Sequence, residues 1–146
     1  MSKQYKIYTA GTMGGLTLSQ QMTWRKKLEN EIRERTDQNV SFIHPPEFYR
    51  YGESWHKSEQ EVMQWDLSQI RDSDIVAVDL STIGDSAGTL MELGFIAATN
   101  QFGPHHVHVI GIGTPNTDHP WIPLSMMRME QDVSSAADYI SNYLLV

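Results

Sequence analysis

Apolar and polar positions repeat along the chain with two different periods, which separates the expected strands from the expected helices. Short runs of β-branched and aromatic residues predict strands over 6–10, 40–43, 74–79 and 107–112. Between and after them, apolar residues recur three or four positions apart, which predicts helices over 19–35, 58–71, 87–99, 124–128 and 135–145. The run 74–79 is apolar almost throughout and is typical of a central parallel strand covered on both faces.

This alternation of strands and helices predicts an α/β fold. We expect a doubly wound (Rossmann- or flavodoxin-like) parallel sheet of about five strands with helices on both faces. No repeat or linker interrupts the pattern, so we expect residues 1–146 to form one domain. Ligands of such folds bind at the carboxyl ends of the strands. The site is therefore expected in the loops that follow Ala10, Asp79 and Ile112.

Composition and charge narrow the classes of function. The net charge is −7, and no basic cluster is larger than Arg25-Lys26-Lys27, so binding to polymeric nucleic acid is not expected. A single nucleotide or nucleoside stays possible as a small-molecule partner. The absence of cysteine excludes disulfides, thiolate metal sites and a cysteine nucleophile. No apolar run approaches the roughly 20 residues of a membrane span and the N-terminus lacks a signal-peptide pattern, so we expect a cytoplasmic protein without a membrane partner.

Histidines are the remaining candidates for metal ligands. His105, His106 and His108 are clustered, and Asp118-His119 is a second pair. The cluster has no clear carboxylate partner, and the pair is a similarly weak indication, so we expect neither a metal nor an organic cofactor. No G-x-S-x-G motif supports serine-hydrolase chemistry.

A glycine-rich loop, Gly11-Thr12-Met13-Gly14-Gly15, follows the first expected strand and precedes a helix. Glycines at this position let backbone amides approach an anion, and the helix dipole assists. The loop matches neither the GxGxxG dinucleotide fingerprint nor the Walker A motif, which needs a lysine. It can be an anion-binding loop or simply a tight turn.

The segment after the central strand contains Asp85, Ser86, Gly88, Thr89 and Glu92. Thr89 and Glu92 have the spacing of a helix capping box, which is a purely structural interpretation. Alternatively, Glu92 is functional, because it lies in the first turns of a helix at the ligand-binding edge.

Two further residues are candidates for this edge. Asp66 lies on the preceding helix, where it could equally be on a solvated face. Tyr8 lies on the first strand, where it could equally be a core residue.

Three motifs together resemble the nucleoside 2-deoxyribosyltransferase family from Lys6 to about Arg128. They are Lys6-Ile7-Tyr8 with its glycine loop, Trp65-Asp66-Leu67 followed by Asp72-Ser73-Asp74-Ile75-Val76, and Glu92-Leu93-Gly94. The resemblance implies that Glu92 is the nucleophile that attacks the anomeric carbon and displaces the base. It implies that Tyr8 holds Glu92 by a hydrogen bond. It also implies that Asp66 contacts the base and helps to protonate the leaving nitrogen.

Position 86 separates two branches of that family. The base-exchanging transferases have an aspartate there, which grips the sugar 5′-hydroxyl. The branch resembling 2′-deoxynucleoside 5′-monophosphate N-hydrolases has a phosphate-binding serine, as Ser86 is here. Asp85 could still act as the transferase aspartate if the loop is shifted by one residue, and Met13 stands in a loop where the hydrolases carry an arginine.

Further residues are candidates for the site. We expect Gly11, Thr12, Gly14, Gly15, Asp85, Ser86 and Gly88 to bind substrate. Ser125 resembles a serine that completes the site of a neighbouring subunit, so a homodimer or larger oligomer is expected. We expect aromatic residues to line or cover the base pocket, namely Phe48, Tyr49, Tyr51 and Trp55.

The leading hypothesis is hydrolysis of the N-glycosidic bond of 2′-deoxynucleoside 5′-monophosphates without a cofactor. Base exchange between deoxynucleosides is the alternative. A ribonucleotide hydrolase is another, since the Gly88-Thr89-x-x-Glu92 pattern also resembles phosphoribohydrolases that release cytokinins. A hypothesis of a different class is a non-catalytic nucleotide sensor on the same fold.

Overall fold

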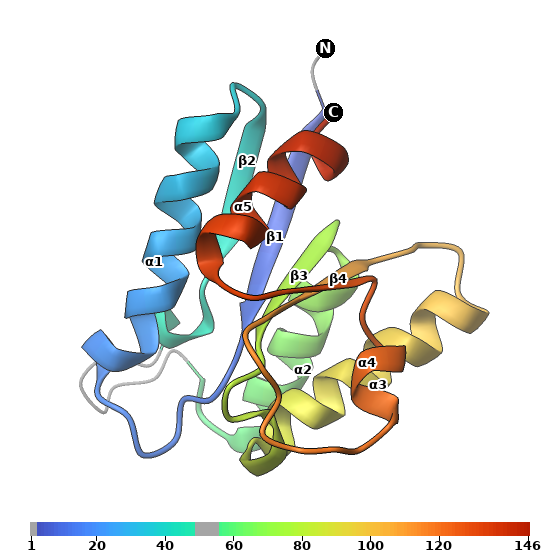
Figure 1. The fold of residues 1–146 in the computed structure, drawn as a ribbon. Helices are drawn as coiled ribbons and strands as arrows, with labels where there is room; N and C mark the ends of the chain where they lie inside the picture. The colour runs from blue at the N-terminus through green and yellow to red at the C-terminus, as the bar shows by residue number, and fades with distance from the viewer. Residues whose placement is uncertain (1–2, 49–55) are drawn as a thin grey trace.

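The computed structural model describes residues 3–48 and 56–146. Strands lie at β1 (Gln4–Ala10), β2 (Asn39–Ile43), β3 (Ile75–Asp79), β4 (His108–Ile112) and β5 (Arg128–Glu130). Helices lie at α1 (Leu18–Arg35), α2 (Glu59–Arg71), α3 (Ala87–Phe102), α4 (Trp121–Leu124) and α5 (Val133–Tyr139), with a π-helical turn at Ile140–Leu144 and 3-10 turns at Pro45–Phe48 and Ile83–Asp85 (Figure 1). None of the helices within these described ranges is long and apolar enough to span a membrane.

The five strands form one parallel sheet in the order β2-β1-β3-β4-β5. The predicted doubly wound fold is therefore confirmed, and the order is that of flavodoxin-like sheets. The chain reverses its direction of winding between β1 and β3, which pair from Ile7↔Ile75 to Ala10↔Val78. The loops that leave these two strands diverge, so a ligand site is expected between them.

Helices cover both faces of the sheet (Figure 1). On one face, Ile7 of β1 packs with Leu28 and Ile32 of α1 and with residues of α5. On the other face, Tyr8 packs with Ile70 of α2 and with residues of α3. Adjacent residues of β1 thus face opposite layers, as the two-residue period of a strand requires. The apolar residues of β3 are buried from both sides, as expected for a central strand.

The C-terminal region differs from the sequence-based prediction. The expected helix over 124–128 is wrong: α4 ends at Leu124, and Arg128 begins strand β5 instead. This strand pairs only with β4 and exposes Arg128 and Met129, so it has no apolar run to mark it. The last helix begins earlier than expected, at Val133, because Asp132 caps it and forms a capping box with Ser135.

Of the aromatic residues expected to line or cover the base pocket, the structure describes only Phe48. The Phe48 ring lies 4.4 Å from that of Trp65 on α2. Tyr49, Tyr51 and Trp55 lie outside the described residues.

Candidate active site

Glu92, Tyr8 and Asp66 converge from three elements at the carboxyl edge of β1 and β3. Helix α3 begins directly after β3, and Glu92 lies one turn beyond Thr89, which is buried. Tyr8 faces the same layer from β1 and is 1% exposed. Asp66 reaches this layer from α2, and its charge acts on both other groups. The structure therefore brings together the three residues predicted to be catalytic.

Burial keeps the Tyr8 phenol protonated. Its pKa is raised well above the ordinary value of 10.0, first by burial and then by the charges of Glu92 and Asp66. Its hydroxyl also acts on Glu92, whose anionic form it favours. Tyr8 is therefore a hydrogen-bond donor that can orient the Glu92 carboxyl group at any physiological pH.

The two carboxyl groups have strongly perturbed pKa values. Burial raises the pKa of Glu92 to about 7 and Asp66 adds to the rise, whereas Tyr8 and Arg25 oppose it. Burial also raises the pKa of Asp66 to about 7, with a further contribution from Glu59. Near neutral pH the pair can thus hold one carboxylate and one carboxylic acid, which is the arrangement that a nucleophile and a proton donor require.

Both carboxyl groups also have an unused oxygen. Oε2 of Glu92 and Oδ1 of Asp66 are buried and have no hydrogen-bond partner among the described residues. Buried polar atoms normally find a partner, and leaving one unpaired costs about 1–3 kcal/mol. Two such atoms in one cluster are what a site that awaits a polar ligand would show.

The N-terminus of α3 offers small groups beside Glu92. Ser86 is the N-cap residue, but its side chain makes no capping bond; its Oγ lies 2.7 Å from Oγ1 of Thr89. The capping-box interpretation of Thr89 and Glu92 is therefore wrong, because the helix begins at Ala87, ahead of Thr89. At Gly88, nothing lies within 4 Å of the position that a Cβ would take. The first amides of the helix lack intrahelical acceptors and can receive an anion here.

The Asp85 side chain makes different contacts from the side chain of Ser86. Its Oδ2 accepts a hydrogen bond from Nδ2 of Asn116 at 3.0 Å, and Asn116 Oδ1 accepts one from the Gly84 amide at 2.6 Å. Asn116 belongs to the loop after β4 and ties that loop to the turn before α3. Sequence reasoning did not identify Asn116, because a single loop asparagine gives no pattern.

The glycine loop closes against the loop after β3. Thr12 Oγ1 lies 2.6 Å from Oγ1 of Thr82, which joins the two loops at the switch point of the sheet. At Gly11, a Cβ would lie 3.2 Å from the Asp79 Cβ, so only glycine fits without displacing a neighbour. Gly15 has φ +78, a conformation that favours glycine. Gly14 is exposed and unobstructed.

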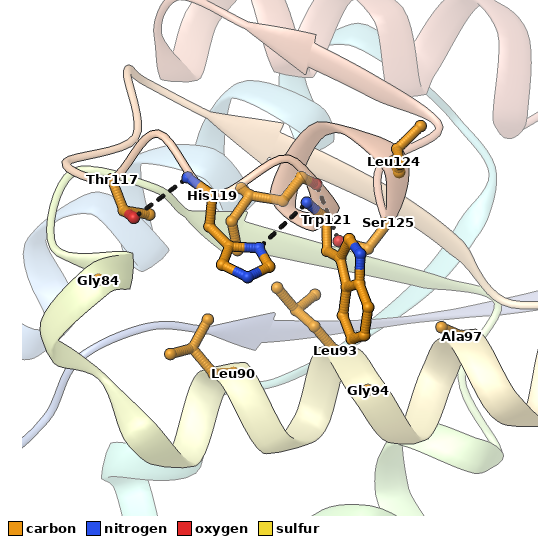
Figure 2. A pocket seen from close by; sticks show the side chains of 11 residues that line it. Gly84, Leu90, Leu93, Gly94, Ala97, Thr117, His119, Trp121, Leu124 and Ser125 are labelled. Atoms are coloured by element: carbon orange, nitrogen blue, oxygen red, sulfur yellow. Dashed lines mark hydrogen bonds between the residues drawn. The ribbon is translucent and has the colours of Figure 1, made fainter.

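Ser125 is not brought to Glu92 within one chain. It lies in a groove of about 470 Å³ between α3 and the segment 117–125 (Figure 2). Leu90 and Gly94 line this groove from α3, and each is two residues from Glu92, which places them about 200° around the helix from it. The other lining residues are Gly84, Leu93, Ala97, Thr117, His119, Trp121, Ile122 and Leu124. The predicted role of Ser125 in the site of a neighbouring subunit stays a prediction.

The clustered histidines lie away from this site, around the start of β4. The rings of His106 and His108 are 5.0 Å apart, edge to face, and His105 contacts the backbone oxygen of Ser73 at 2.8 Å. Within residues 3–48 and 56–146, no group of three or more His, Asp or Glu side chains is arranged to hold a metal ion.

Sequence reasoning also missed Arg25 of α1, which reaches the same edge from the other face. It is fully buried, with hydrogen bonds to Thr9, Gln21 and Gly11. Within Arg25-Lys26-Lys27 it resembles part of a solvated basic run. Its spacing to Leu28 and Ile32 was the available signal, since it puts Arg25 on the buried stripe of the helix.

Comparison with solved structures supports the fold. A 2-deoxyribosyltransferase from the psychrotolerant bacterium Bacillus psychrosaccharolyticus is 23% identical, with 94% of this chain and 91% of that chain covered and a TM-score of 0.61. A conserved protein from Enterococcus faecalis V583 is 16% identical, with 94% and 98% covered and a TM-score of 0.66. Comparison with curated proteins found no match.

The model of the family described as "nucleoside 2-deoxyribosyltransferase like" matches residues 4–107. The match includes β1 with the glycine loop, α2 with Asp66, and α3 with Glu92. It therefore covers most of the chain, including Glu92, Asp66 and Tyr8. The chain belongs to the nucleoside 2-deoxyribosyltransferase-like family.

Proposed function

We propose that the protein hydrolyses the N-glycosidic bond of 2′-deoxynucleoside 5′-monophosphates through a covalent intermediate on Glu92. The observation that carries the proposal is the convergence of Glu92, Asp66 and Tyr8 in one buried cluster, with two carboxyl groups whose pKa values are raised to about 7. Family membership supports chemistry at a nucleoside N-glycosidic bond.

The first step cleaves the bond to the base. A Glu92 carboxylate oxygen attacks C1′ of the sugar while the bond between C1′ and the base nitrogen breaks. The bonding electrons leave with the nitrogen, which receives the proton of the Asp66 carboxylic acid. Tyr8 donates a hydrogen bond to Glu92 and keeps the attacking oxygen in line.

The second step releases the sugar. Water attacks C1′ and gives its proton to the Asp66 carboxylate, while the bond between C1′ and Glu92 breaks. Deoxyribose 5-phosphate leaves, and both carboxyl groups return to their starting states. As in retaining glycosidases, one carboxyl group is the nucleophile and the other alternates between acid and base.

The preference for a monophosphate rests on Ser86. Its hydroxyl lies beside Thr89 at the start of α3, where helix amides and the dipole favour an anion. Asp85, which could act as the sugar-binding carboxylate of a transferase, is engaged with Asn116 instead. A carboxylate beside the phosphate would repel it, whereas a hydroxyl can donate to it.

A substrate panel tests the proposal. The protein is incubated with each deoxynucleoside, deoxynucleotide and ribonucleotide, with and without adenine as acceptor, and free base is separated by chromatography. We expect free base from deoxynucleoside monophosphates. Cleavage of nucleosides alone would reject the phosphate preference, and a new nucleoside formed from the added adenine would favour base exchange.

The variant Glu92→Ala tests the mechanism, with Glu34→Ala, an exposed carboxylate on α1, as the matched control. We expect Glu92→Ala to abolish base release and Glu34→Ala to leave it unchanged. Release that survives Glu92→Ala would contradict the covalent mechanism. Nucleotide binding without base release from any substrate, in the wild type, would favour the nucleotide sensor.

We also propose that a second copy covers the groove that contains Ser125. Trp121 is 73% exposed and Leu124 is 80% exposed at its rim, and exposed apolar side chains gathered beside a groove are typical of an interaction surface. Light scattering after size exclusion should then give the mass of a dimer or larger oligomer. A monomer at micromolar concentration would count against Ser125 as a site residue.

A further inference from the structure

Four hydrogen-bonded side chains form a buried polar chain on the α1 side of the sheet. Arg25 and Thr9 are 0% exposed and His44 is 2% exposed. Arg25 Nε lies 3.2 Å from Thr9 Oγ1, which lies 2.8 Å from His44 Nδ1. His44 Nε2 in turn lies 2.7 Å from Oε1 of Glu29. These hydrogen bonds link α1 with β1 and with His44 after the end of β2, next to the glycine loop.

One assignment of donors satisfies every member of this chain. Burial lowers the pKa of His44, so its ring is neutral near pH 7. Burial alone would raise the pKa of Glu29, but hydrogen bonds from His44 and Arg33 hold it below its ordinary value. His44 Nε2–H then donates to Glu29, the Thr9 hydroxyl donates to His44 Nδ1, and Arg25 Nε–H donates to Thr9. Arg25 is thus held in a single orientation.

The other N–H groups of Arg25 reach the glycine loop. Nη2 donates to the Gly11 carbonyl at 3.2 Å, and Nη1 donates to the Gln21 carbonyl at 2.5 Å. The Gln21 side chain donates to the carbonyls of Met13 and Leu16, both at 2.9 Å. Arg25 and Gln21 therefore bind the start, middle and end of the loop to α1 by hydrogen bonds.

Among residues 3–48 and 56–146, no carboxylate accepts a hydrogen bond from Arg25, whose acceptors there are three backbone carbonyls and one hydroxyl. The charge of Arg25 acts through space on Tyr8 of β1, Asp79 of β3 and Glu92 of α3. Glu92 in turn faces Tyr8, Asp66 of α2 and Arg25. Of these groups, Asp66 disfavours the anionic form of Glu92, whereas Tyr8 and Arg25 both favour it.

We propose that Arg25 is a positioning residue of the active site, which fixes the glycine loop through the Gly11 carbonyl and favours the anionic form of Glu92 by its positive charge. The chain from Thr9 through His44 to Glu29 holds the guanidinium in place. The consequence for base release rests on the proposed function, whereas the effects on Glu92 and on the loop do not.

The test compares the full-length wild type with Arg25→Met, Arg25→Lys and Lys27→Met, which removes an exposed cation from the same helix. Two measurements need no substrate: the Glu92 titration by carbon-13 NMR and amide hydrogen exchange over residues 11–17. In Arg25→Met the Glu92 midpoint should rise, because a positive charge that favours its anionic form is lost. Exchange of the loop amides should become at least about tenfold faster.

The other two variants separate charge from geometry. Arg25→Lys keeps the charge but cannot reach Thr9, Gly11 and Gln21 together, so loop exchange should rise while the Glu92 midpoint stays near that of the wild type. Lys27→Met should change neither measurement. If Arg25→Met does not fold, Arg25→Lys decides the question. Loop amides that exchange in Arg25→Lys at the wild-type rate would overturn the positioning role. A folded Arg25→Met with unchanged titration and exchange overturns the proposal entirely.

Base release distinguishes this inference from the proposed function. If Glu92 must be ionised to attack, the acid limb of the pH profile of kcat should rise in Arg25→Met by the same amount as the NMR midpoint. A wild type that releases no base, together with a shifted Glu92 midpoint in Arg25→Met, rejects the proposed function and supports this inference. Base release with an unmoved acid limb and an unmoved midpoint rejects this inference and supports the function.

Discussion

Replacing Glu92 with glutamine should stabilise the protein, and the gain should depend on pH. Burial raises the pKa of Glu92 from 4.5 to about 7, so the folded protein holds this proton more tightly than the unfolded chain does. Each unit of difference corresponds to about 1.36 kcal/mol. Ionising Glu92 in the folded state therefore costs about 3 kcal/mol, a cost that glutamine avoids.

The pH window follows from the two pKa values. Below pH 4.5 the carboxyl group is protonated in both states, so Glu92 and glutamine should give similar stability. As the pH rises from 4.5 through 7, the wild type progressively loses the contribution of the bound proton and Glu92→Gln does not. The difference in the free energy of unfolding should then grow from near zero to about 3 kcal/mol at pH 8.

Urea unfolding followed by tryptophan fluorescence measures this difference. The wild type, Glu92→Gln and the control Glu34→Gln are compared at pH 4.5, 6, 7 and 8 under the same ionic strength. The control should differ from the wild type by less than about 0.5 kcal/mol at every pH, because its carboxyl group is exposed. A Glu92→Gln difference that is the same at pH 4.5 and pH 8 would refute the burial argument.

Three further predictions concern the site and its loop. Asp66→Asn should lower kcat for base release by about 10²–10⁴-fold, because the proton donor is lost; an unchanged kcat in single-turnover assays would contradict its role. Ser86→Asp should raise KM for a deoxynucleoside monophosphate at least about tenfold while sparing the deoxynucleoside; steady-state kinetics that show equal losses would argue against a phosphate site. Gly11→Ala should destabilise the fold by about 1–3 kcal/mol, because its Cβ would lie 3.2 Å from that of Asp79, whereas Gly14→Ala, with open space, should be near neutral in thermal unfolding.

Local patterns predicted the sheet and its principal helices because each of those elements buries an apolar stripe. Strand β5 escaped prediction because it is a short edge strand whose side chains are largely exposed. Its position depends on pairing with β4, which is a tertiary interaction. By contrast, the start of α3 at Ala87 was predicted correctly, and the turn at Ile83–Asp85 with its contact to Asn116 precedes it.

The cluster of Glu92, Asp66 and Tyr8 could be predicted only because motifs far apart in the sequence resemble those of one family. Taken alone, the sequence around Glu92 was also compatible with a structural cap, and Asp66 with a solvated face. What the sequence could not reveal is their burial, which depends on packing between α2, α3 and β1 and raises both pKa values. Arg25 illustrates the opposite case, in which a residue beside two lysines is buried because of its position on the helix.

The two faces of α3 have a consequence for which changes in chain length the protein can tolerate. One added residue between Thr89 and Glu92 would turn all that follows by about 100°. Glu92 would leave Tyr8, and the side chains that line the groove beyond it would turn away from Trp121. Residues 113–120 form no helix or strand, so a change of length there turns no such element, although Asn116 anchors the loop and Thr117 and His119 line the groove. Insertions and deletions in related chains are therefore expected in that loop, while the number of residues from Ser86 to Ala97 should stay fixed.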